Sequence, residues 1–281
     1  MVTENYDVSA SKQDIVSRNV NRDRFYEYYA EVSQTPDTQQ RFARLRNMLV
    51  RVIEAAKLNT RKLHIADIGC GAGTQALLWS ELGHHVHGID TNAPLLDLAR
   101  KRAANAGYDI DLRTGFAEKL PWPDMSMDIC LAIELLEHVP EWKKSLNEFA
   151  RILRPGGILC LTTTNVLCPI QHEFRLPFYS WYPAALKRYC EHLAVTTRPA
   201  LANHAKYPAV NWFSYFGLAA FLHKLGFRTL DRFDVLEAKS KSFLSKTIIT
   251  AIRKINVLRW CAHVATVGTL VVAIKEVDLP S

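Results

Sequence analysis

Short apolar runs alternate with helix-like apolar patterns along most of the chain. Helical patterns begin near Thr74, Pro94 and Trp142, cover residues 212–225, and occupy residues 25–56 with an interruption at Pro36. Seven runs have the length of strands: 63–68, 86–89, 110–113, 128–133, 158–163, 228–235 and 269–275. Strand, helix, strand at this spacing is typical of a parallel sheet covered on both faces, with right-handed connections. The pattern therefore predicts a doubly wound α/β fold.

The domain organisation follows from the same pattern. Residues 1–24 are polar and predict a flexible N-terminus, whereas residues 25–281 show no repeat and no clear linker. We therefore expect a single domain with two insertions, an aromatic-rich one at 165–210 and a basic one at 238–267.

Composition and charge add one localised feature. The 281 residues have an ordinary globular composition, which excludes collagen-like, low-complexity and wholly disordered chains. The net charge is +7, but residues 238–281 alone carry seven basic and two acidic side chains, a surplus of +5. The charge therefore belongs to one C-terminal segment beside a nearly neutral body.

Cysteine usage and the N-terminal sequence bear on the compartment. The six cysteines form no CxxC pair, and Cys130 and Cys160 lie in apolar runs, which argues for a reducing compartment and against a disulfide or zinc framework. The first residues have no apolar core, and the longest apolar stretch, 264–274, is too short to span a bilayer. We expect an intracellular, cytoplasmic protein.

A glycine-rich loop follows the first strand. Gly69, Gly71 and Gly73 occupy alternate positions, so the backbone can turn sharply and approach a ligand closely. The helix that follows offers free N–H groups to an anion, and a phosphate or a carboxylate suits it equally. Asp90 ends the second strand, where an acid is placed to bond ribose hydroxyls.

Four motifs in order carry a family resemblance. They are the Asp67–Thr74 run, Gly88-Ile89-Asp90, residues 115–122 followed by Asp128, and Arg154-Pro155-Gly156-Gly157 before the fifth strand. Together they resemble the class I methyltransferases that use S-adenosylmethionine (SAM). The resemblance implies a seven-stranded, mostly parallel, Rossmann-like sheet with a helical, aromatic lid insertion. A NAD-dependent enzyme is disfavoured, because the glycines lack the GxGxxG spacing.

The resemblance also assigns the cofactor-binding residues. Gly69, Gly71 and Gly73 would lie under the methionine part of SAM, with Asp67 near its ammonium group, and Asp90 would hold the ribose hydroxyls.

At the adenine end, the resemblance implies that Ala117 and Glu118 border the base. The chain departs from the family at Phe116, where an aspartate is common. A phenyl ring cannot accept a hydrogen bond from the adenine amine, so a backbone group or Glu118 would do so.

Three polar residues follow the fourth strand, where doubly wound folds place their ligands: Glu134, Glu137 and His138. The string resembles the Glu-x-x-Glu-His of the ubiquinone-biosynthesis O-methyltransferases, where it is associated with a magnesium-type ion. Three interpretations are open. The trio binds Mg²⁺; or Glu134 shapes the SAM site while His138 or Glu137 acts as a general base; or the residues are structural.

The insertion at 165–210 is rich in aromatic and basic side chains. Insertions of this length are usually functional, and here a lid over the acceptor is expected, with His172 as a second candidate base. The alternative is a helical cap whose aromatic residues form a core.

The basic insertion contains apolar residues at helical spacing between 241 and 260, with Lys246 and Arg253 on the opposite face. An acid-free helix of this kind can lie in a membrane interface, so peripheral membrane contact is one interpretation, and a solvated cap or dimer helix is the other. Nucleic acid is not expected, because the cations are not interleaved with stacking aromatics.

Taken together, the sequence predicts a SAM-dependent O-methyltransferase acting on a small or lipid-linked metabolite. The rival hypotheses are methylation of a macromolecule, RNA or protein, and a SAM-binding subunit without activity of its own. Oligomeric state and acceptor identity are left open by the sequence.

Overall fold

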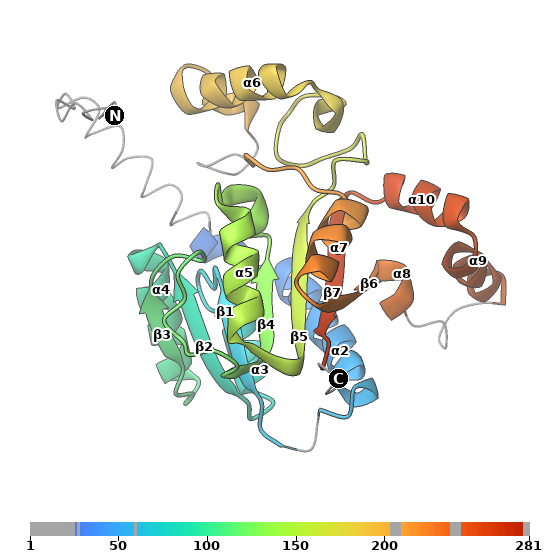
Figure 1. Ribbon diagram of the computed structural model, residues 1–281. Helices are drawn as coiled ribbons and strands as arrows, with labels where there is room; N and C mark the ends of the chain where they lie inside the picture. The colour runs from blue at the N-terminus through green and yellow to red at the C-terminus, as the bar shows by residue number, and fades with distance from the viewer. Residues whose placement is uncertain (1–25, 27–28, 59–60, 203–208, 237–242, 278–281) are drawn as a thin grey trace, which may run out of the picture.

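The computed structural model describes residue 26 and residues 29–58, 61–202, 209–236 and 243–277. The expected flexible N-terminus, residues 1–24, lies outside the described residues. Figure 1 shows a central sheet with helices on both faces and two helical segments that extend beyond it.

The sheet has seven strands in the order β3-β2-β1-β4-β5-β7-β6. Strands β1 to β5 are parallel to their neighbours, and β7 is antiparallel to both β5 and β6. The predicted doubly wound, seven-stranded and mostly parallel fold is therefore confirmed. The strands are β1 His64–Ile68, β2 His85–Asp90, β3 Asp111–Thr114, β4 Met127–Ile133, β5 Leu153–Thr164, β6 Phe227–Asp231 and β7 Gly268–Lys275.

Helices cover both faces of this sheet. Buried side chains of α2 and α3 pack on one face, those of α5 and α7 on the other, and α4 packs beside β3. The helices are α2 Pro36–Ala55, α3 Thr74–Ser80, α4 Ala93–Asn105, α5 Trp142–Ile152, α6 Ala184–Thr196, α7 Tyr215–Lys224, α8 Arg232–Val235, α9 Phe243–Lys254 and α10 Asn256–Val264, with 3₁₀ turns η1 Leu136–His138, η2 Tyr179–Trp181 and η3 Pro199–Leu201.

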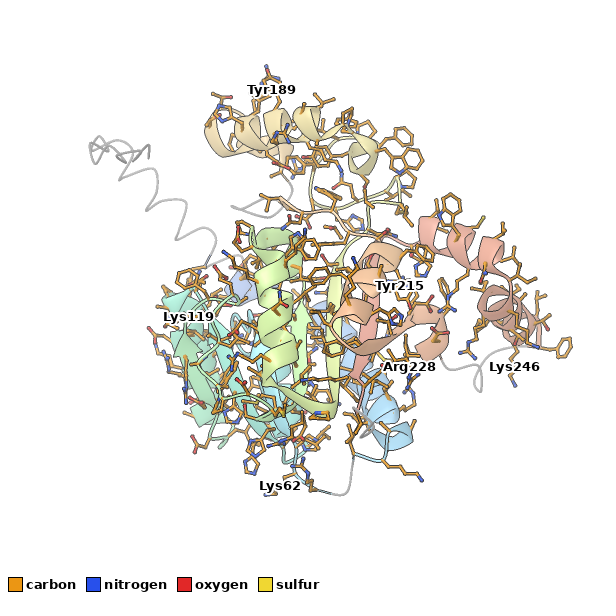
Figure 2. All side chains as sticks on the ribbon, in the orientation of Figure 1. Lys62, Lys119, Tyr189, Tyr215, Arg228 and Lys246 are labelled. Atoms are coloured by element: carbon orange, nitrogen blue, oxygen red, sulfur yellow. The ribbon has the colours of Figure 1, made fainter. Side chains whose placement is uncertain are left out.

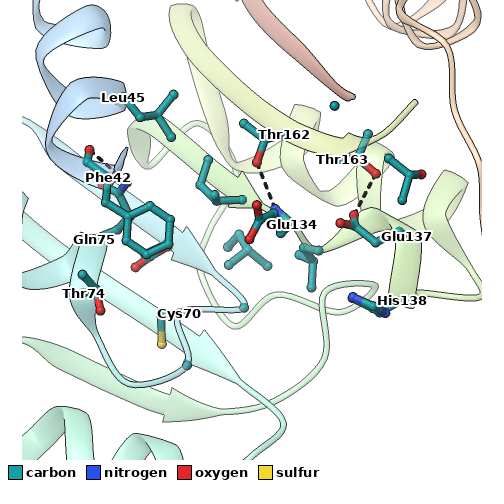
Figure 3. A pocket seen from close by; sticks show the side chains of 18 of the residues that line it. Phe42, Leu45, Cys70, Thr74, Gln75, Glu134, Glu137, His138, Thr162 and Thr163 are labelled. Carbon is teal, nitrogen blue, oxygen red and sulfur yellow. Dashed lines mark hydrogen bonds between the residues drawn. The ribbon is translucent and has the colours of Figure 1, made fainter. Parts of the chain in front are cut away.

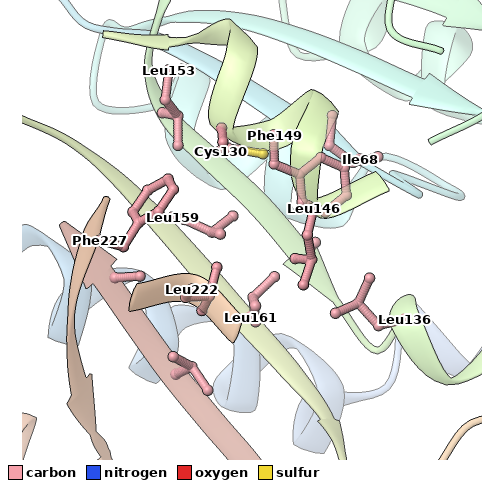
Figure 4. Packing of buried hydrophobic residues seen from close by; sticks show 14 of the residues in the cluster. Ile68, Cys130, Leu136, Leu146, Phe149, Leu153, Leu159, Leu161, Leu222 and Phe227 are labelled. Atoms are coloured by element: carbon pink, nitrogen blue, oxygen red, sulfur yellow. The ribbon is translucent and has the colours of Figure 1, made fainter. Parts of the chain in front are cut away.

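The core follows the two-residue periodicity of the strands. On one face, Leu159 and Leu161 of β5 pack with Phe149 of α5 and Leu222 of α7 (Figure 4). Ile158 and its alternate neighbour Cys160 face the other helical layer. The cysteines, all of them among the described residues, are free thiols, and Cys130 and Cys160 are fully buried.

The structure corrects the prediction after the sixth strand. The strand expected over 228–235 ends at Asp231, and α8 takes its place. Asp231 ends the strand because its carboxylate accepts the backbone N–H groups of Phe233 and Asp234, which starts a helix.

The basic segment is also different from the prediction. The single helix expected over 241–260 is two helices, α9 and α10, separated by an extended Ile255. Tertiary contacts hold this geometry. Arg253 donates to the carbonyl of Phe233, and Arg259 pairs with Asp231 and Asp234, so both helices are fastened to α8.

The aromatic insertion holds η2, α6 and η3, and α6 stands beyond the carboxyl ends of the strands (Figure 1). It has a small core of its own, in which Phe174 stacks on the fully buried Tyr179. Phe178 and Trp181, in contrast, stack on each other at the surface. The core interpretation thus holds for some of these aromatics and fails for others.

Candidate functional site

The glycine loop between β1 and α3 adopts a left-handed backbone at all three glycines, with φ of 72°, 49° and 79° at Gly69, Gly71 and Gly73. A Cβ on Gly69 would lie 2.9 Å from a methyl group of Leu135, and one on Gly73 would lie 2.9 Å from Cβ of Ala99. At Gly71 the nearest atom would be 4.0 Å away. Two of the glycines are therefore required for packing, whereas Gly71 brings bare backbone to the cavity.

Asp90 joins this loop to the second strand. Its carboxylate accepts the N–H of Gly71 at 2.8 Å and the N–H of Asn92 at 2.7 Å. Burial raises the pKa of Asp90, while these backbone donors oppose that shift. The side chain lines the cavity at the end of β2, where a ribose would be bound.

Asp67 lies at the end of β1 and is almost completely buried. Burial, with a smaller contribution from the charge of Asp90, raises the pKa of Asp67 to about 7. Its Oδ2 has no hydrogen-bond partner among the described residues, although it lines the cavity. A buried carboxyl group with an unused oxygen fits the ammonium group of SAM.

The residues expected at the adenine end lie on one rim of the cavity. Ala117 is buried, Glu118 is half-buried, and the ring of Phe116 is exposed. A backbone bridge between Phe116 and Lys119 holds this turn closed. The exposed ring offers a face on which a base could stack.

Glu134, Glu137 and His138 do not converge on one point (Figure 3). Glu134, held in a left-handed conformation at the end of β4, forms an ion pair with Arg41 of α2. Glu137 accepts the hydroxyl of Thr163 at 2.7 Å. Among the described residues no group of three His, Cys, Asp or Glu side chains could hold a metal ion. The trio therefore does not fit the Mg²⁺ interpretation, one of the three that the sequence leaves open.

Glu137 is buried, and burial raises its pKa to about 8 despite the hydrogen bond from Thr163. Its backbone carbonyl accepts the N–H groups of Val210 and Asn211, which fixes η1 against the segment after the lid. At neutral pH this group is held mostly in its protonated form.

His138 and His172 both line the cavity, from η1 and from the loop after β5. The sequence analysis missed Glu173, which also lines it. Burial and the charge of Glu134 raise the pKa of Glu173 to about 6. In the sequence, only its position next to His172 could have indicated that Glu173 belongs to the site.

A single large cavity, about 1450 Å³, joins these groups at the carboxyl ends of the strands. Its far wall comes from α2, which contributes Phe42 and Leu45 (Figure 3). Met48 and three arginines of the same helix also line the cavity. The sequence analysis did not assign α2 to the site. The helical spacing of these residues could have suggested an apolar face, but not that the face borders a cavity.

Comparison with known proteins agrees with this geometry. Residues 66–161 match the family model described as a methyltransferase domain. A ubiquinone biosynthesis O-methyltransferase from Chelativorans is 37% identical over 103 residues, covering 37% of this chain and 41% of the relative. A malonyl-[acyl-carrier protein] O-methyltransferase from Serratia marcescens is 34% identical over 99 residues, covering 35% and 37%. The chain thus matches about two fifths of these relatives' length.

Among solved structures, a proposed sarcosine dimethylglycine methyltransferase from Galdieria sulphuraria has a TM-score of 0.52 and 18% identity, covering 83% of this chain and 86% of that one. This likeness shows the fold. The expectation of a class I, Rossmann-like methyltransferase fold is confirmed, and residues 66–161 match a methyltransferase domain. The acceptor and the roles of individual residues are taken up below.

Proposed function

We propose that the chain is a SAM-dependent O-methyltransferase for a small or lipid-linked metabolite. The observation that carries the proposal is the constellation of Asp67, the glycine loop and Asp90 in one cavity, within a segment that matches the methyltransferase family. In this proposal residues 25–281 act as a single domain, with 165–210 covering the acceptor.

The residues divide the work of binding. The glycine loop and Asp67 hold the amino-acid end of the cofactor, Asp90 holds the ribose, and Ala117 and Glu118 border the base. When bound, SAM supplies a methyl group on a reactive sulfonium. The chain then has to align an acceptor oxygen in line with that methyl group and exclude water, which is mainly a matter of positioning. Glu134, fixed by Arg41, shapes the wall beside the glycine loop.

We propose His138 as the base that takes the acceptor's proton. It lies in η1 at the end of β4, and imidazole is the commonest general base. Glu137, protonated near neutral pH, would donate a hydrogen bond to the acceptor and so help to orient it. His172 is the second candidate base, on the opposite wall.

Methyl transfer from labelled SAM into a fractionated cell extract tests the activity and the acceptor class together. We expect label in the small-molecule or lipid fraction, with a loss of about 100-fold in His138→Gln. His172→Gln would lose less. Label in RNA or protein would favour the macromolecular hypothesis, and no label in any fraction would favour the non-catalytic subunit.

The proposal includes peripheral membrane contact through α9 and α10. The apolar side chains of the predicted helix are turned outward, because Arg253 and Arg259 on the other side are fastened to α8. Figure 2 shows Lys246 of α9 at the outer edge of the molecule. The exposed apolar residues are Phe243, Leu244, Ile248, Ile255, Val257, Leu258 and Trp260.

This surface combines exposed apolar groups with a segment that has no acidic residue between Glu237 and Glu276. The combination suits an anionic membrane interface. No helix in the described parts of the chain is long and apolar enough to cross a membrane.

Co-sedimentation with vesicles of phosphatidylglycerol and phosphatidylcholine tests the contact. A Leu244→Gln, Val257→Gln double variant should reduce the bound fraction several-fold, because it replaces two exposed apolar side chains of this surface with polar ones. The matched control is Leu82→Gln, an exposed leucine on the turn before β2. Equal sedimentation of the double variant and the wild type, or no sedimentation of either, would reject the contact.

A further inference from the structure

Four arginines line the cavity: Arg41, Arg44 and Arg51 from α2, and Arg232 from α8. Arg41 is neutralised by its ion pair with Glu134. Within the described part of the chain the other three form no ion pair. Among the described residues, Glu134 is the one carboxylate paired with these four arginines, so the α2–α8 side of the cavity carries three cations without a paired carboxylate.

The arginines of α2 follow the helix away from the glycine loop. At a rise of about 1.5 Å per residue, Arg44 lies about one turn beyond Arg41. Arg51 lies about 15 Å from Arg41 along the helix axis. Arg51 and Val235 of α8 line both this cavity and the smaller one beside it. Helices α2 and α8 therefore flank the same end of the cavity.

Of the three arginines, Arg232 has the geometry that most clearly favours a bound anion. One of its terminal nitrogens donates to the carbonyl of Gly268 at 2.6 Å, while its Nε is buried and has no hydrogen-bond partner among the described residues. Burial lowers the pKa of Arg232, which reflects the cost of removing the cation from water. A half-buried guanidinium with an unused donor favours the arrival of an anion.

The neighbouring carboxylates are already occupied. Asp231 accepts Arg259 at 2.7 Å and His263 at 2.8 Å, and Asp234 pairs with Arg259. Neither is paired with Arg232. Gly268, which accepts the hydrogen bond from Arg232, pairs with Thr164 at the carboxyl end of β5. The neighbouring Thr163 donates to Glu137, so Arg232 and Glu137 lie near the same end of β5.

The cavity wall between these arginines is apolar, and it is formed by Leu45, Met48, Leu236, Val267 and Leu270. The carboxylates that line the cavity lie instead near the ends of β1, β2 and β4, at the glycine loop, or in the two loops that follow β3 and β5. Cations and apolar groups are thus combined on the side of the cavity that the cofactor proposal leaves for the acceptor.

We propose that the acceptor is an amphipathic anion, whose carboxylate or phosphate is bound by Arg44, Arg51 and Arg232 between α2 and α8. Its apolar body extends from this head group along the apolar wall of the cavity, and the oxygen to be methylated lies toward His138. The proposal rests on the proposed function for the identity of the cavity as a methyl-transfer site. It adds the charge and polarity that an acceptor must have.

Calorimetric titration with octyl phosphate, octanoate and octanol tests the proposal, because these probes share one chain and differ in the head group. We expect the wild type to bind at least one of the anions about tenfold or more tightly than octanol. The phosphate and carboxylate arms show which anion is preferred. An Arg44→Gln, Arg51→Gln double variant should lose about tenfold in anion affinity and keep its affinity for octanol, since both side chains are exposed and form no hydrogen bond or ion pair within the described part of the chain.

The matched control is an Arg100→Gln, Arg113→Gln double variant, which removes the same charge at exposed positions outside the cavity. Equal affinities for the three probes, or anion binding that is as weak in this control as in the Arg44 and Arg51 variant, would overturn the proposal. A SAM titration of the same samples separates the two hypotheses: absent SAM binding with intact anion selectivity contradicts the proposed function alone.

Discussion

At the scale of single residues, the protonation of Asp67 links cofactor binding to pH. The carboxyl group is buried, its Oδ2 has no hydrogen-bond partner among the described residues, and burial raises its pKa to about 7. The ammonium group of SAM would favour the ionised form, so binding near neutral pH requires loss of a proton from part of the molecules.

We therefore predict that SAM affinity increases with pH between about 5.5 and about 7, by up to about tenfold per unit. The reason is that protonated Asp67 cannot pair with the ammonium group. Calorimetry in buffers of different ionisation enthalpy should detect proton release on binding. Asp67→Asn should bind more weakly at pH 7 and lose most of the pH dependence. An unchanged pH dependence in Asp67→Asn would contradict this role.

At the scale of elements, the amino ends of β1 and β2 hold a stack of histidines, far from the cavity. The ring of His64 stacks on His85 and His87 at centroid distances of 5.0 and 5.6 Å. Burial, followed by the charges of His87 and His85, lowers the pKa of His64 below the ordinary 6.5. The unfolded chain thus binds this proton more readily than the folded one, and the contribution of His64 to stability decreases as pH falls through 6.5.

We predict that the melting temperature of His64→Gln, relative to that of the wild type, is higher at pH 5.5 than at pH 7.5, because the variant lacks the proton uptake that the fold disfavours. The comparison is made between the two proteins at each pH, since the raised pKa values of Asp67, Glu137 and Glu173 act in the opposite direction in both of them. Thermal unfolding followed by circular dichroism at both pH values provides the measurement. His223→Gln, at an exposed position of α7, serves as the control. A difference between His64→Gln and the wild type that is the same at both pH values would show that the stack does not contribute.

Most helices and strands could be predicted from the sequence, but some of their boundaries and surroundings could not. The places of the strands and the glycine loop were predicted correctly, apart from the end of the sixth strand, because alternation and glycine spacing are local signals. The helix over 241–260 was wrong, because the break at Ile255 depends on Arg253 and Arg259 reaching α8, which is a tertiary contact. The periodicity of α2 did not reveal that Leu49 packs on the sheet while Leu45 borders the cavity. The two positions follow one repeat and differ only in what the fold places opposite them.

At the scale of the whole molecule, the basic residues form two separate groups, one on α9 and α10 and one in the cavity. The basic residues of α9 and α10, which would serve membrane contact, do not line the cavity, while a separate group of arginines does. The acids at the ends of β1 and β2 face the cofactor end. One cavity therefore contains an acidic side suited to an ammonium group and a cationic side suited to an anionic acceptor.

The central claim is that this cavity binds SAM through the glycine loop and Asp90, and calorimetric titration with SAM tests it most directly. We predict that the wild type binds SAM and that Gly71→Arg and Asp90→Ala each lose at least tenfold in SAM affinity. The arginine fills the site, whereas the alanine removes the carboxylate that would bind the ribose and that accepts the N–H of Gly71. Asp97→Ala, at an exposed position of α4, should bind as the wild type does. No binding by a folded wild type, or unchanged affinity in both site variants, would contradict the account.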